Sequence, residues 1–462
     1  MVPDDLKIAK IIPVYKSDDK KIVSNYRPIS VLPAFSKILE KLVYNRLLDF
    51  INQHNLLSKD QYGFRKNIST SMALIDLTDK ISTSLENNEY TIGVFLDLAK
   101  AFDTVNHSIL LDKLYHYGIR GIPFQWFQNY LSNRLQYVYL NNTNSDKLPI
   151  TCGVPQGSIL GPILFLLYIN DLSTVTKLLT FIMFADDTNI FISGKNLDFI
   201  THIINSELTT VSTWFNANLL SLNIKKTNNY ILFSNKTNPD IQILIGNEKV
   251  ARVFQTKFLG IIIQANLKWK EHISLVANKT VKTLGVMNKI KHFLTSAYLK
   301  NLYQSLIEPY LTYCCIVWAK PDKSTALETL LKLQKRSVRI ISHSWYRACS
   351  RPLFHKFSIL TIYDLCLLQI LVFVYKSINL LLPNSYTQYF TRTSDIHYYK
   401  TRGHKYNLYK INAQKTCRTN SIMCSGPKHW NKLPDIIKCA PSLKVFKNKV
   451  RDHILASYLT TF

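Results

Sequence analysis

Three aspartates stand at the ends of predicted strands. Asp97 follows an apolar run at 91–96, and Asp186 and Asp187 lie at the turn of a predicted hairpin. If one antiparallel sheet holds both segments, the three carboxylates meet. Crowded carboxylates repel each other unless a divalent cation neutralises them, and their oxygens suit Mg²⁺. Two such ions about 3.5–4 Å apart can support nucleotidyl transfer. An ordinary Asp-Asp turn is the alternative, because Asp is common in turns.

A second polar segment lies between these acids. The turn at 153–157 contains two glycines, which allow a nucleotide to approach the backbone closely. Gln156 adds an amide that can hydrogen-bond to a sugar, a base or a template edge. Ser158 could cap the helix that follows, so we expect a structural role for it. The turn is a weak signal by itself and a stronger one between two acidic segments.

Both strands and helices must position these residues. The spacing of apolar residues predicts a mixture of strands and helices up to about residue 265, and mainly helices beyond it. Strands are expected at 7–15, 91–96, 180–184, 189–193, 230–233, 241–245 and 258–263, with a strand pair within 136–151. Helices are expected at 35–51, 124–131, 197–218 and from the 153–157 turn to about 171, with helical segments to 318 and over 326–382. The last eighty residues give weak signals.

The composition describes a folded chain. Of 462 residues, 47% are hydrophobic and 12% aromatic, which excludes disorder over most of the length. The 13 Gly and 16 Pro exclude collagen-like and low-complexity classes. No apolar run approaches the roughly 18 residues that a membrane span needs, and no secretory signal precedes the first strand.

Cysteine usage suggests a reducing compartment with free thiols, because eight Cys occur in a long chain without a secretory signal. A zinc site remains an open alternative for one group near the C-terminus. Its spacing lacks the close first pair that is usual in structural zinc sites. The group consists of Cys417, Cys424, His429 and Cys439.

The charge balance favours a polyanionic partner. The chain has 57 Lys and Arg against 30 Asp and Glu, a net charge of +27. Most of the excess lies in the C-terminal half: 265–300 holds seven Lys and one acid, and 401–462 holds twelve basic residues and two acids. Nucleic acid is the leading candidate because neutralised phosphates release condensed counterions. The alternative is a scattered charge that only aids solubility.

The order of the motifs resembles that of the reverse transcriptases of LINE-type retrotransposons, which lack long terminal repeats, and most of all the jockey-like group. The core segments are FLDLAKAFD at 95–103, GVPQGSILGP at 153–162 and FADD at 184–187. Supporting segments are NYRPIS at 25–30, QYGFR at 61–65, KKT at 225–227 and FLG at 258–260. The resemblance runs from about residue 6 to 319, and SGPKHWNKLP at 425–434 resembles that group's usual ending.

The resemblance implies an α+β right-hand polymerase with a mostly helical C-terminal extension. The antiparallel sheet would form the palm and a helical segment the thumb. The implied domains are fingers at 1–90, a palm at 91–265 that includes finger residues at about 110–150, a thumb at 266–325 and a basic extension at 326–462. The family also carries an endonuclease domain and more finger structure before the point that matches Met1. We therefore expect a truncated copy or a start within the polymerase region, and assign no nicking to this chain.

Site residues follow from the resemblance by position. Asp97, Asp186 and Asp187 would be the catalytic metal-binding carboxylates, and Leu98 would add its backbone carbonyl. Phe102 matches the aromatic residue that closes on the sugar and excludes a 2′-hydroxyl, with helical core packing as its alternative. Asp103 is assigned no metal. Further nucleotide contacts would be Gln156, Arg27, Lys16, Arg65, Lys225 and Lys226, the last two as candidates to protonate pyrophosphate. Nucleic-acid contacts would be Gly157, Lys268, Lys270, Lys282 and Lys289.

The implied reaction is RNA-templated DNA synthesis with Mg²⁺, or Mn²⁺ as a substitute. The partners would be an RNA template, a DNA primer or target, deoxynucleoside triphosphates, a separate endonuclease and an element-encoded RNA-binding protein, with no membrane. Priming from nicked chromosomal DNA would place the work in the nucleus after a cytoplasmic ribonucleoprotein stage. Two alternatives stay open: a catalytically inactive nucleic-acid-binding remnant, and an RNA-dependent RNA polymerase, which Phe102 disfavours.

Overall fold

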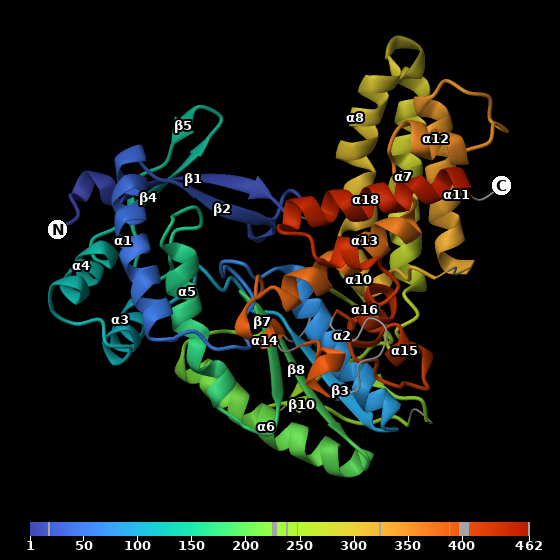
Figure 1. The fold of residues 1–462 in the computed structure, drawn as a ribbon. Helices are drawn as coiled ribbons and strands as arrows, with labels where there is room; N and C mark the ends of the chain where they lie inside the picture. The colour runs from blue at the N-terminus through green and yellow to red at the C-terminus, as the bar shows by residue number, and fades with distance from the viewer. Residues whose placement is uncertain are drawn as a thin grey trace. The chain divides into compact units, whose positions relative to one another are not determined.

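The computed structural model describes residues 1–16, 19–223, 229–236, 239–246, 248–322, 325–387, 389–396 and 406–460 (Figure 1). The chain forms two compact units. The first consists of 1–66, 92–230 and 239–252, and the second of 67–91, 231–238 and 253–462. The expected α+β class, with antiparallel sheets and a helical C-terminal region, is confirmed. The division into fingers, palm, thumb and extension stays a prediction.

The first unit contains most of the strands. Its helices are η1 (Asp4–Lys7), η2 (Val23–Asn25), α1 (Ala34–Gln53), α3 (His107–His116), α4 (Gly121–Leu131), α5 (Gly161–Ile169), η3 (Asn170–Thr174) and α6 (Leu197–Ala217). Its strands are β1 (Ile8–Tyr15), β2 (Tyr26–Val31), β4 (Leu135–Leu140), β5 (Thr143–Asn144), β6 (Leu148–Pro149), β7 (Thr180–Phe184), β8 (Asp187–Gly194), β10 (Leu244–Ile245), β11 (Glu248–Lys249) and β12 (Ala251–Arg252). The strands β3 (Tyr90–Leu96) and β9 (Asn229–Phe233) begin or end in the second unit.

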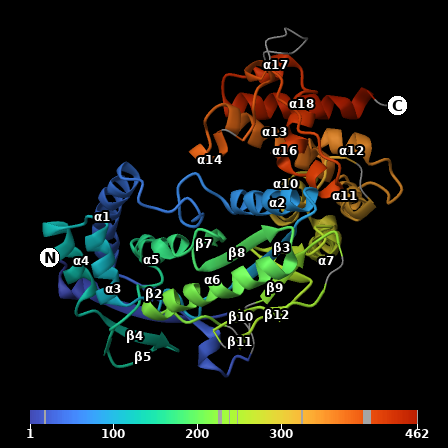
Figure 2. The same cartoon turned by 90° about the horizontal axis from the view of Figure 1, so that it is seen from below.

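A five-stranded sheet in the order β12-β9-β3-β8-β7 carries the acidic segments. β7 and β8 pair antiparallel from Thr180 opposite Phe191 to Phe184 opposite Asp187. The strand β3 is apolar on both faces, and Ile92 and Val94 are fully buried. The helix α6 runs along one side of this sheet and contacts β8 (Figures 1 and 2).

Apolar periodicity explains why α6 covers the sheet. Its buried residues recur three or four positions apart, which places them on one face of the helix. They are Leu197, Ile200, Ile204, Leu208, Val211 and Phe215. The side chain of Asn196 caps the helix by accepting a hydrogen bond from the N–H of Phe199. The helix α5 is buried along almost its whole length, as its unbroken apolar sequence requires.

A second sheet of the first unit brings the N-terminal strands together in the order β2-β1-β4-β5, with β6 paired to β4. β1 and β2 are antiparallel, from Lys10 opposite Val31 to Tyr15 opposite Tyr26. β1 and β4 are parallel. Arg27 lies on β2, and Lys16 follows the last residue of β1.

The structure corrects three expected strands. The turn between β7 and β8 is shorter than expected, because β8 begins at Asp187. The strand expected at 258–263 is a hairpin of β13 (Gln255–Phe258) and β14 (Ile261–Gln264). Leu259 and Gly260 form its turn with φ of 44° and 80°, which end an extended run. Only Leu244–Ile245 of the expected 241–245 strand is paired.

The second unit is mainly helical. Besides β13 and β14, it contains α2 (Thr70–Glu86), α7 (Lys270–Ile290), η4 (Lys291–Phe293), α8 (Ser296–Leu306), α9 (Glu308–Thr312), α10 (Cys315–Trp318), α11 (Thr325–Ile341), α12 (Arg351–Lys356), α13 (Ile362–Ile378), α14 (Asn384–Thr387), η5 (Thr393–Asp395), α15 (Thr416–Thr419), α16 (Ile422–Trp430), α17 (Asp435–Lys438) and α18 (Leu443–Thr460). The helix α13 lies at its centre and contacts α10, α11, α16 and α18. Tyr375 of α13 stacks on Phe446 of α18 at a centroid distance of 4.3 Å.

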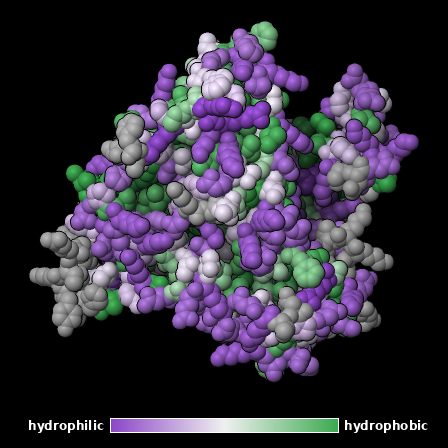
Figure 3. Space-filling view, turned by 90° about the vertical axis from the view of Figure 1, so that its right-hand side faces the viewer, coloured by the Kyte–Doolittle hydropathy of each residue, from purple (hydrophilic) through white to green (hydrophobic). Residues whose placement is uncertain are grey.

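The face drawn in Figure 3 is mostly hydrophilic, and its hydrophobic side chains form small separate patches. None of the helices in the described residues is both long and apolar enough to cross a bilayer.

A buried ion pair joins α2 to the C-terminal segment within the second unit. Asp79 of α2 is 5% exposed, and a guanidinium nitrogen of Arg418 lies 3.8 Å from its carboxylate. The hydroxyl of Tyr389 donates a hydrogen bond to the same carboxylate. Burial raises the pKa of Asp79 to about 6, while Tyr389 and Arg418 oppose that rise. The cation is therefore needed most when Asp79 is ionised.

We expect Arg418→Met to destabilise the protein more at pH 8 than at pH 5. The pKa of Asp79 in the folded protein, about 6, lies above the usual 3.8 of an aspartate, so the stability that its protonated form contributes is lost as the pH rises through about 6. Without Arg418, the ionised carboxylate is buried without its cation, which costs about 3 kcal/mol at pH 8. Urea unfolding followed by circular dichroism at both pH values measures the difference.

The control for that experiment is Arg336→Met, which removes an exposed arginine from α11 in the same unit. This substitution should change the free energy of unfolding by less than about 0.5 kcal/mol at either pH. An equal loss of stability for Arg418→Met at pH 5 and pH 8 would contradict the assigned role of the ion pair.

Candidate active site

The turn between β7 and β8 places two of the three acids. Ala185 and Asp186 connect the strands, and Asp187 pairs with Phe184 as the first residue of β8. Ala185 has a φ of 57°, in the left-handed region that residues with a Cβ seldom adopt. Such a conformation persists when surrounding contacts hold it.

Gln61 supplies those contacts. Its side-chain oxygen Oε1 accepts hydrogen bonds from the N–H of Ala185 at 2.9 Å and from the N–H of Gly63 at 2.8 Å. The backbone beside it pairs with β7, because the N–H of Tyr62 donates to the carbonyl of Met183 at 2.8 Å. Gln61 is 1% exposed. A buried amide thus fixes the backbone of the acidic turn.

Gly63 is required by the same packing. A Cβ added at this position would lie 2.3 Å from the backbone nitrogen of Ala185, a distance at which the backbone must shift. From the sequence, the 61–65 segment carried a family resemblance and the expected nucleotide contact of Arg65. Its role in positioning the turn was missed, because the contact joins residues more than a hundred positions apart.

The end of β3 is fixed by a neighbouring segment of the first unit. The carbonyl of Asp97 accepts a hydrogen bond from the N–H of Asn223 at 3.0 Å, and the N–H of Ala99 donates to the carbonyl of Ser221 at 2.9 Å. Leu98 lies between them in an isolated antiparallel bridge with Leu222, and its side chain is buried. Only the backbone of Leu98 is therefore suited to a polar contact at the site.

Burial and neighbouring charge raise the pKa values of two of the three acids. Burial is the largest cause of the raised pKa of Asp187, which is about 6, and the charges of Asp186 and Asp97 add to it. The pKa of Asp186 is also raised by burial and by the charge of Asp97. Arg27 and Lys16 lower the pKa of Asp186, which places their positive charges near this carboxylate. The structure thus brings together the acids that the sequence singled out.

A divalent cation fits this donor set. Negative charges that raise each other's pKa are stabilised by a bound cation, and hard carboxylate oxygens suit Mg²⁺. As placed, no three His, Cys, Asp or Glu side chains in the described part of the chain are close enough to hold one ion. The site therefore has the charge that a metal needs, but its ligands are not closed around a common point.

The same finding applies to the zinc alternative. Cys417, Cys424, His429 and Cys439 all lie in the described residues and do not form a metal-holding group. Burial lowers the pKa of His429 to about 4. This histidine is therefore neutral near pH 7, and packing accounts for its position.

The loop at 153–157 pairs with the residues that follow β3. The side-chain amide of Gln156 donates to the carboxylate of Asp103 at 2.9 Å, and the N–H of Val154 donates to the carbonyl of Phe102 at 2.8 Å. Gly153 has a φ of 88°, and a Cβ there would lie 2.8 Å from the carbonyl oxygen of Asp103. Asp103 thus orients Gln156, a role consistent with its having no assigned metal.

The far side of this loop contacts β2. The carbonyl of Gln156 accepts a hydrogen bond from the N–H of Ser30 at 2.8 Å. A Cβ at Gly157 would lie 2.4 Å from the carbonyl oxygen of Ser30, so only glycine fits. Ser158 donates to the carbonyl of Pro155 and accepts from the N–H of Gly161, the structural role expected for it.

Glu40 is a second positioning residue that the sequence did not reveal. It lies on α1, is 1% exposed, and accepts a hydrogen bond from the N–H of Ile159 at 2.6 Å. Its other oxygen accepts from the hydroxyl of Tyr130 at 2.7 Å. One buried carboxylate thus anchors the start of the segment that leads into α5.

Phe102 packs between two other rings. Its ring stacks on Phe165 of α5 at a centroid distance of 4.6 Å and meets Phe64 edge-on at 6.2 Å. The side chain remains partly exposed. This position is compatible with contact to a sugar and with core packing, the two roles expected for Phe102, because the ring is packed against Phe165 and still partly accessible.

The remaining candidates are distributed over both units. Arg65 donates from one guanidinium nitrogen to the carbonyls of Ser58 at 2.8 Å and Gln61 at 3.1 Å, so this nitrogen stabilises its own loop. Lys225 and Lys226 lie outside the described residues. The exposed lysines Lys268, Lys270, Lys282 and Lys289 belong to the second unit, just before or on α7.

Comparison with known proteins shows the family to which the chain belongs. Residues 15–287 match the family described as reverse transcriptase (RNA-dependent DNA polymerase). The RNA-directed DNA polymerase from mobile element jockey of Drosophila melanogaster is 30% identical over 359 residues, covering 74% of this chain and 38% of that protein. The probable RNA-directed DNA polymerase from transposon BS of the same species is 28% identical, covering 74% and 39%. The chain thus spans about two fifths of these relatives.

Among solved structures, apo telomerase from Candida tropicalis aligns with a TM-score of 0.41 and 13% sequence identity. The alignment covers 78% of this chain and 62% of that chain.

We expect Gln61→Met to loosen the turn at 184–187. The substitution keeps the length of the side chain but leaves the N–H groups of Ala185 and Gly63 without their acceptor, which costs about 1–3 kcal/mol of stability. Hydrogen exchange followed by mass spectrometry should show faster exchange in peptides that cover this turn. Gln128→Met on the exposed face of α4 is the matched control. Unchanged exchange at the turn in the Gln61 variant would show that other contacts hold Ala185.

Proposed function

The chain belongs to the reverse transcriptase family, and from that premise we propose that it is an RNA-directed DNA polymerase of a retrotransposon without long terminal repeats. The observation that carries the proposal is the group of three acids at the ends of β3 and β7 and the start of β8, in which burial and neighbouring negative charge raise the pKa values of Asp186 and Asp187. The right-hand polymerase fold expected from the sequence agrees with this α+β architecture and its helical C-terminal region.

Asp97, Asp186 and Asp187 hold the divalent ions in this proposal, together with the backbone carbonyl of Leu98. Mg²⁺ is the proposed ion and Mn²⁺ its substitute. When bound, such ions activate the attacking hydroxyl and stabilise the leaving oxygen of a phosphoryl transfer. The turn that Gln61 fixes holds the backbone that carries two of these carboxylates.

The basic residues of the first unit orient the nucleotide. Arg27 and Lys16 already place positive charge near Asp186. Their proposed ligand is the triphosphate of the incoming deoxynucleotide, because the fork of an arginine matches phosphate oxygens. The primer 3′-hydroxyl attacks the α-phosphate and pyrophosphate leaves. Lys225 or Lys226 is the proposed proton donor to that pyrophosphate.

Two residues read the sugar and the base in this proposal. Gln156, held by Asp103, presents its amide beside the nucleotide. Phe102 is supported by Phe165, so its ring cannot easily withdraw from a ribose 2′-hydroxyl. A rigid ring discriminates by clash, which requires that the ring itself be well packed.

The proposed partners are an RNA template, a DNA primer and deoxynucleoside triphosphates. Gly157, Lys268, Lys270, Lys282 and Lys289 are the proposed contacts to template and primer. Synthesis that primes from a nick in target DNA would need an endonuclease and an element-encoded RNA-binding protein. It would also place the protein in the nucleus after a cytoplasmic ribonucleoprotein stage.

Asp186→Asn should abolish extension of a labelled DNA primer on an RNA template with deoxynucleotides and Mg²⁺. Replacing one ligand removes charge that holds the metal, and we expect a loss of roughly 10²–10⁴-fold in rate. Asp198→Asn, an exposed acid in the first turn of α6, is the matched control and should extend normally. If neither the parent nor the control extends the primer while both bind the template duplex, the chain is a binding protein and the proposal fails.

Phe102→Val should admit ribonucleotides. Shape discrimination by one apolar side chain contributes about 1–3 kcal/mol, so the ratio of kcat/KM for ribo- and deoxynucleotides should rise about 10–100-fold. Phe102→Tyr keeps the ring and should keep the discrimination. A Phe102→Val enzyme that still rejects ribonucleotides would assign this residue to core packing alone. A parent enzyme that prefers ribonucleotides would instead favour an RNA-dependent RNA polymerase.

A further inference from the structure

A large cavity lies within the second unit, and none of its lining residues belongs to the carboxylate site. Its volume is about 1120 Å³. Its walls come from α2, the start of α7, residues 316–320, the start of α11 and residues 414–422, all of which belong to the second unit. The cavity therefore depends on the packing of that unit alone.

The charge of this cavity has a single sign. Four lysines line it, and no Asp, Glu or His does: the four are Lys268, Lys270, Lys320 and Lys415. In the described residues, Lys268, Lys270 and Lys320 make no ion pair within 4.0 Å. Lys415 differs, because its ammonium donates to the carbonyl of Leu85 and to the side chain of Asn88, and the carboxylate of Glu86 lies near its charge. A concave wall of fixed positive charge attracts anions.

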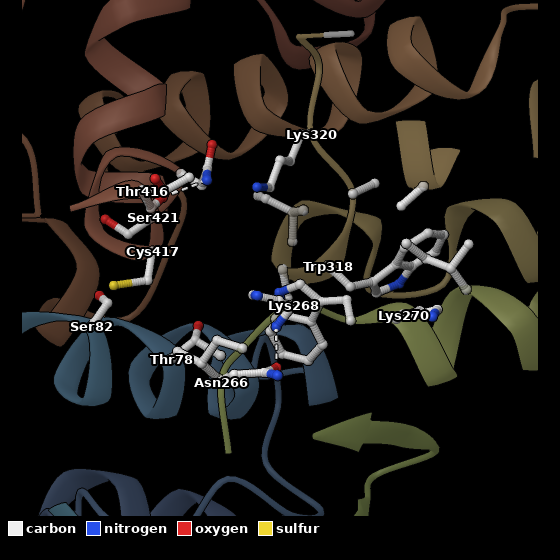
Figure 4. Close-up of a pocket in the computed structure, with 18 of the residues that line it drawn as sticks. Thr78, Ser82, Asn266, Lys268, Lys270, Trp318, Lys320, Thr416, Cys417 and Ser421 are labelled. Carbon is white, nitrogen blue, oxygen red and sulfur yellow. Dashed lines mark hydrogen bonds between the residues drawn. The ribbon is translucent and has the colours of Figure 1, made fainter. Parts of the chain in front are cut away.

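Lys320 follows α10 by two residues, and its side chain extends into the cavity. Figure 4 shows its ammonium directed into the cavity, with Thr416 and Ser421 on the opposite wall and Lys268 below. The side chain is half-buried, and desolvation lowers its pKa. A partly desolvated ammonium without a carboxylate partner gains stability when an anion binds beside it.

The remaining walls favour contact with phosphates over contact with bases. Asn266, Asn278 and Thr416 offer exposed polar side chains in the lining. The two tryptophans of the lining, Trp269 and Trp318, are 5% and 1% exposed. Buried rings cannot accept a stacked base, which needs an open ring face. The lining thus recognises charge and hydrogen-bonding oxygens without reading a sequence.

We propose that this cavity binds phosphate groups of a single-stranded nucleic-acid segment. The proposal rests on the proposed function, because it assumes that the chain works on nucleic acids. Lysines spread over separate walls suit several phosphates of one strand better than a single phosphate. The volume also exceeds the roughly 300–1,000 Å³ of pockets for one small ligand. A free nucleotide or inorganic phosphate shares the chemistry and is the alternative source.

Lysine footprinting tests which source occupies the cavity. The full chain is acetylated with a water-soluble ester of acetic acid, alone or with a ten-residue oligouridylate, uridine monophosphate or inorganic phosphate. Mass spectrometry then compares acetylation of Lys268 and Lys320 with that of Lys444, an exposed residue on α18 that serves as an internal control. We expect the oligonucleotide to protect Lys268 and Lys320 and to leave Lys444 reactive.

Each outcome decides the proposal. Protection by the oligonucleotide and not by the mononucleotide or phosphate at equal phosphate concentration supports a strand-binding cavity. Equal protection by all three overturns the strand and assigns the cavity to free phosphates. Absence of protection at Lys268 and Lys320 with every probe overturns the cavity as a phosphate site.

Salt dependence supplies a second measurement. Removing two phosphate contacts by Lys268→Gln with Lys320→Gln should reduce the slope of log K against log salt by about 1.4 for a single strand. The matched control, Lys444→Gln with Lys447→Gln, also removes two exposed charges and should leave the slope unchanged. Lys268→Arg with Lys320→Arg should restore it. A slope that stays at the parent value in the glutamine variant would contradict the proposal.

Failure of this inference is distinguishable from failure of the proposed function. Footprinting requires no catalysis, so the Asp186→Asn chain should show the same protection of Lys320 as the parent. A parent that extends primers without protecting Lys320 retains its function and loses this site. A parent that protects Lys320 without extending primers keeps the site and loses the function.

Discussion

The repulsion among Asp97, Asp186 and Asp187 is the constraint that the first unit is organised to withstand. Burial and the negative charge of Asp97 raise the pKa of Asp186, and burial and the charges of Asp186 and Asp97 raise the pKa of Asp187. A flexible turn would relieve this repulsion by moving the acids apart. The backbone contacts at the ends of β3 and β7 oppose that movement, which leaves protonation or the binding of a cation as the ways to lower the energy. The proposed metal ions would supply that cation.

Buried polar side chains do the positioning in this unit. Gln61 binds the backbone of the acidic turn, Asp103 binds Gln156, and Glu40 binds the N–H of Ile159. Each of these contacts satisfies a buried donor or acceptor that would otherwise cost stability. They also connect segments that lie far apart in the sequence, so the loop, the turn and the helix α5 form one supported framework. The geometry of the site therefore depends on these hydrogen bonds as well as on the acids themselves.

The sequence predicted the acids better than it predicted their supports. The apolar run of β3 ends at Leu96, so the sequence shows that Asp97 follows a strand. Asp186 and Asp187 likewise lie where one predicted strand ends and the next begins. The turn was expected to be longer, because a polar Asp187 gives no local sign that it begins β8. Leu259 and Gly260 were read as strand for the opposite reason, since their apolar neighbours conceal a turn. Gln61 and Glu40 were out of reach, because a side chain's distant partner leaves no periodic signal in its own neighbourhood.

In the second unit, the fold brings together lysines whose grouping the composition does not reveal. An excess of lysine in 265–300 and 401–462 predicts only that the surface is basic. The buried pair of Asp79 and Arg418 draws the C-terminal segment against α2, and this contact places residues 414–422 opposite the start of α7 and Lys320. Lysines that lie between positions 268 and 415 of the sequence then line one cavity. Like charges that are gathered in a concave surface repel each other, so the packing that forms the cavity also favours the binding of an anion there.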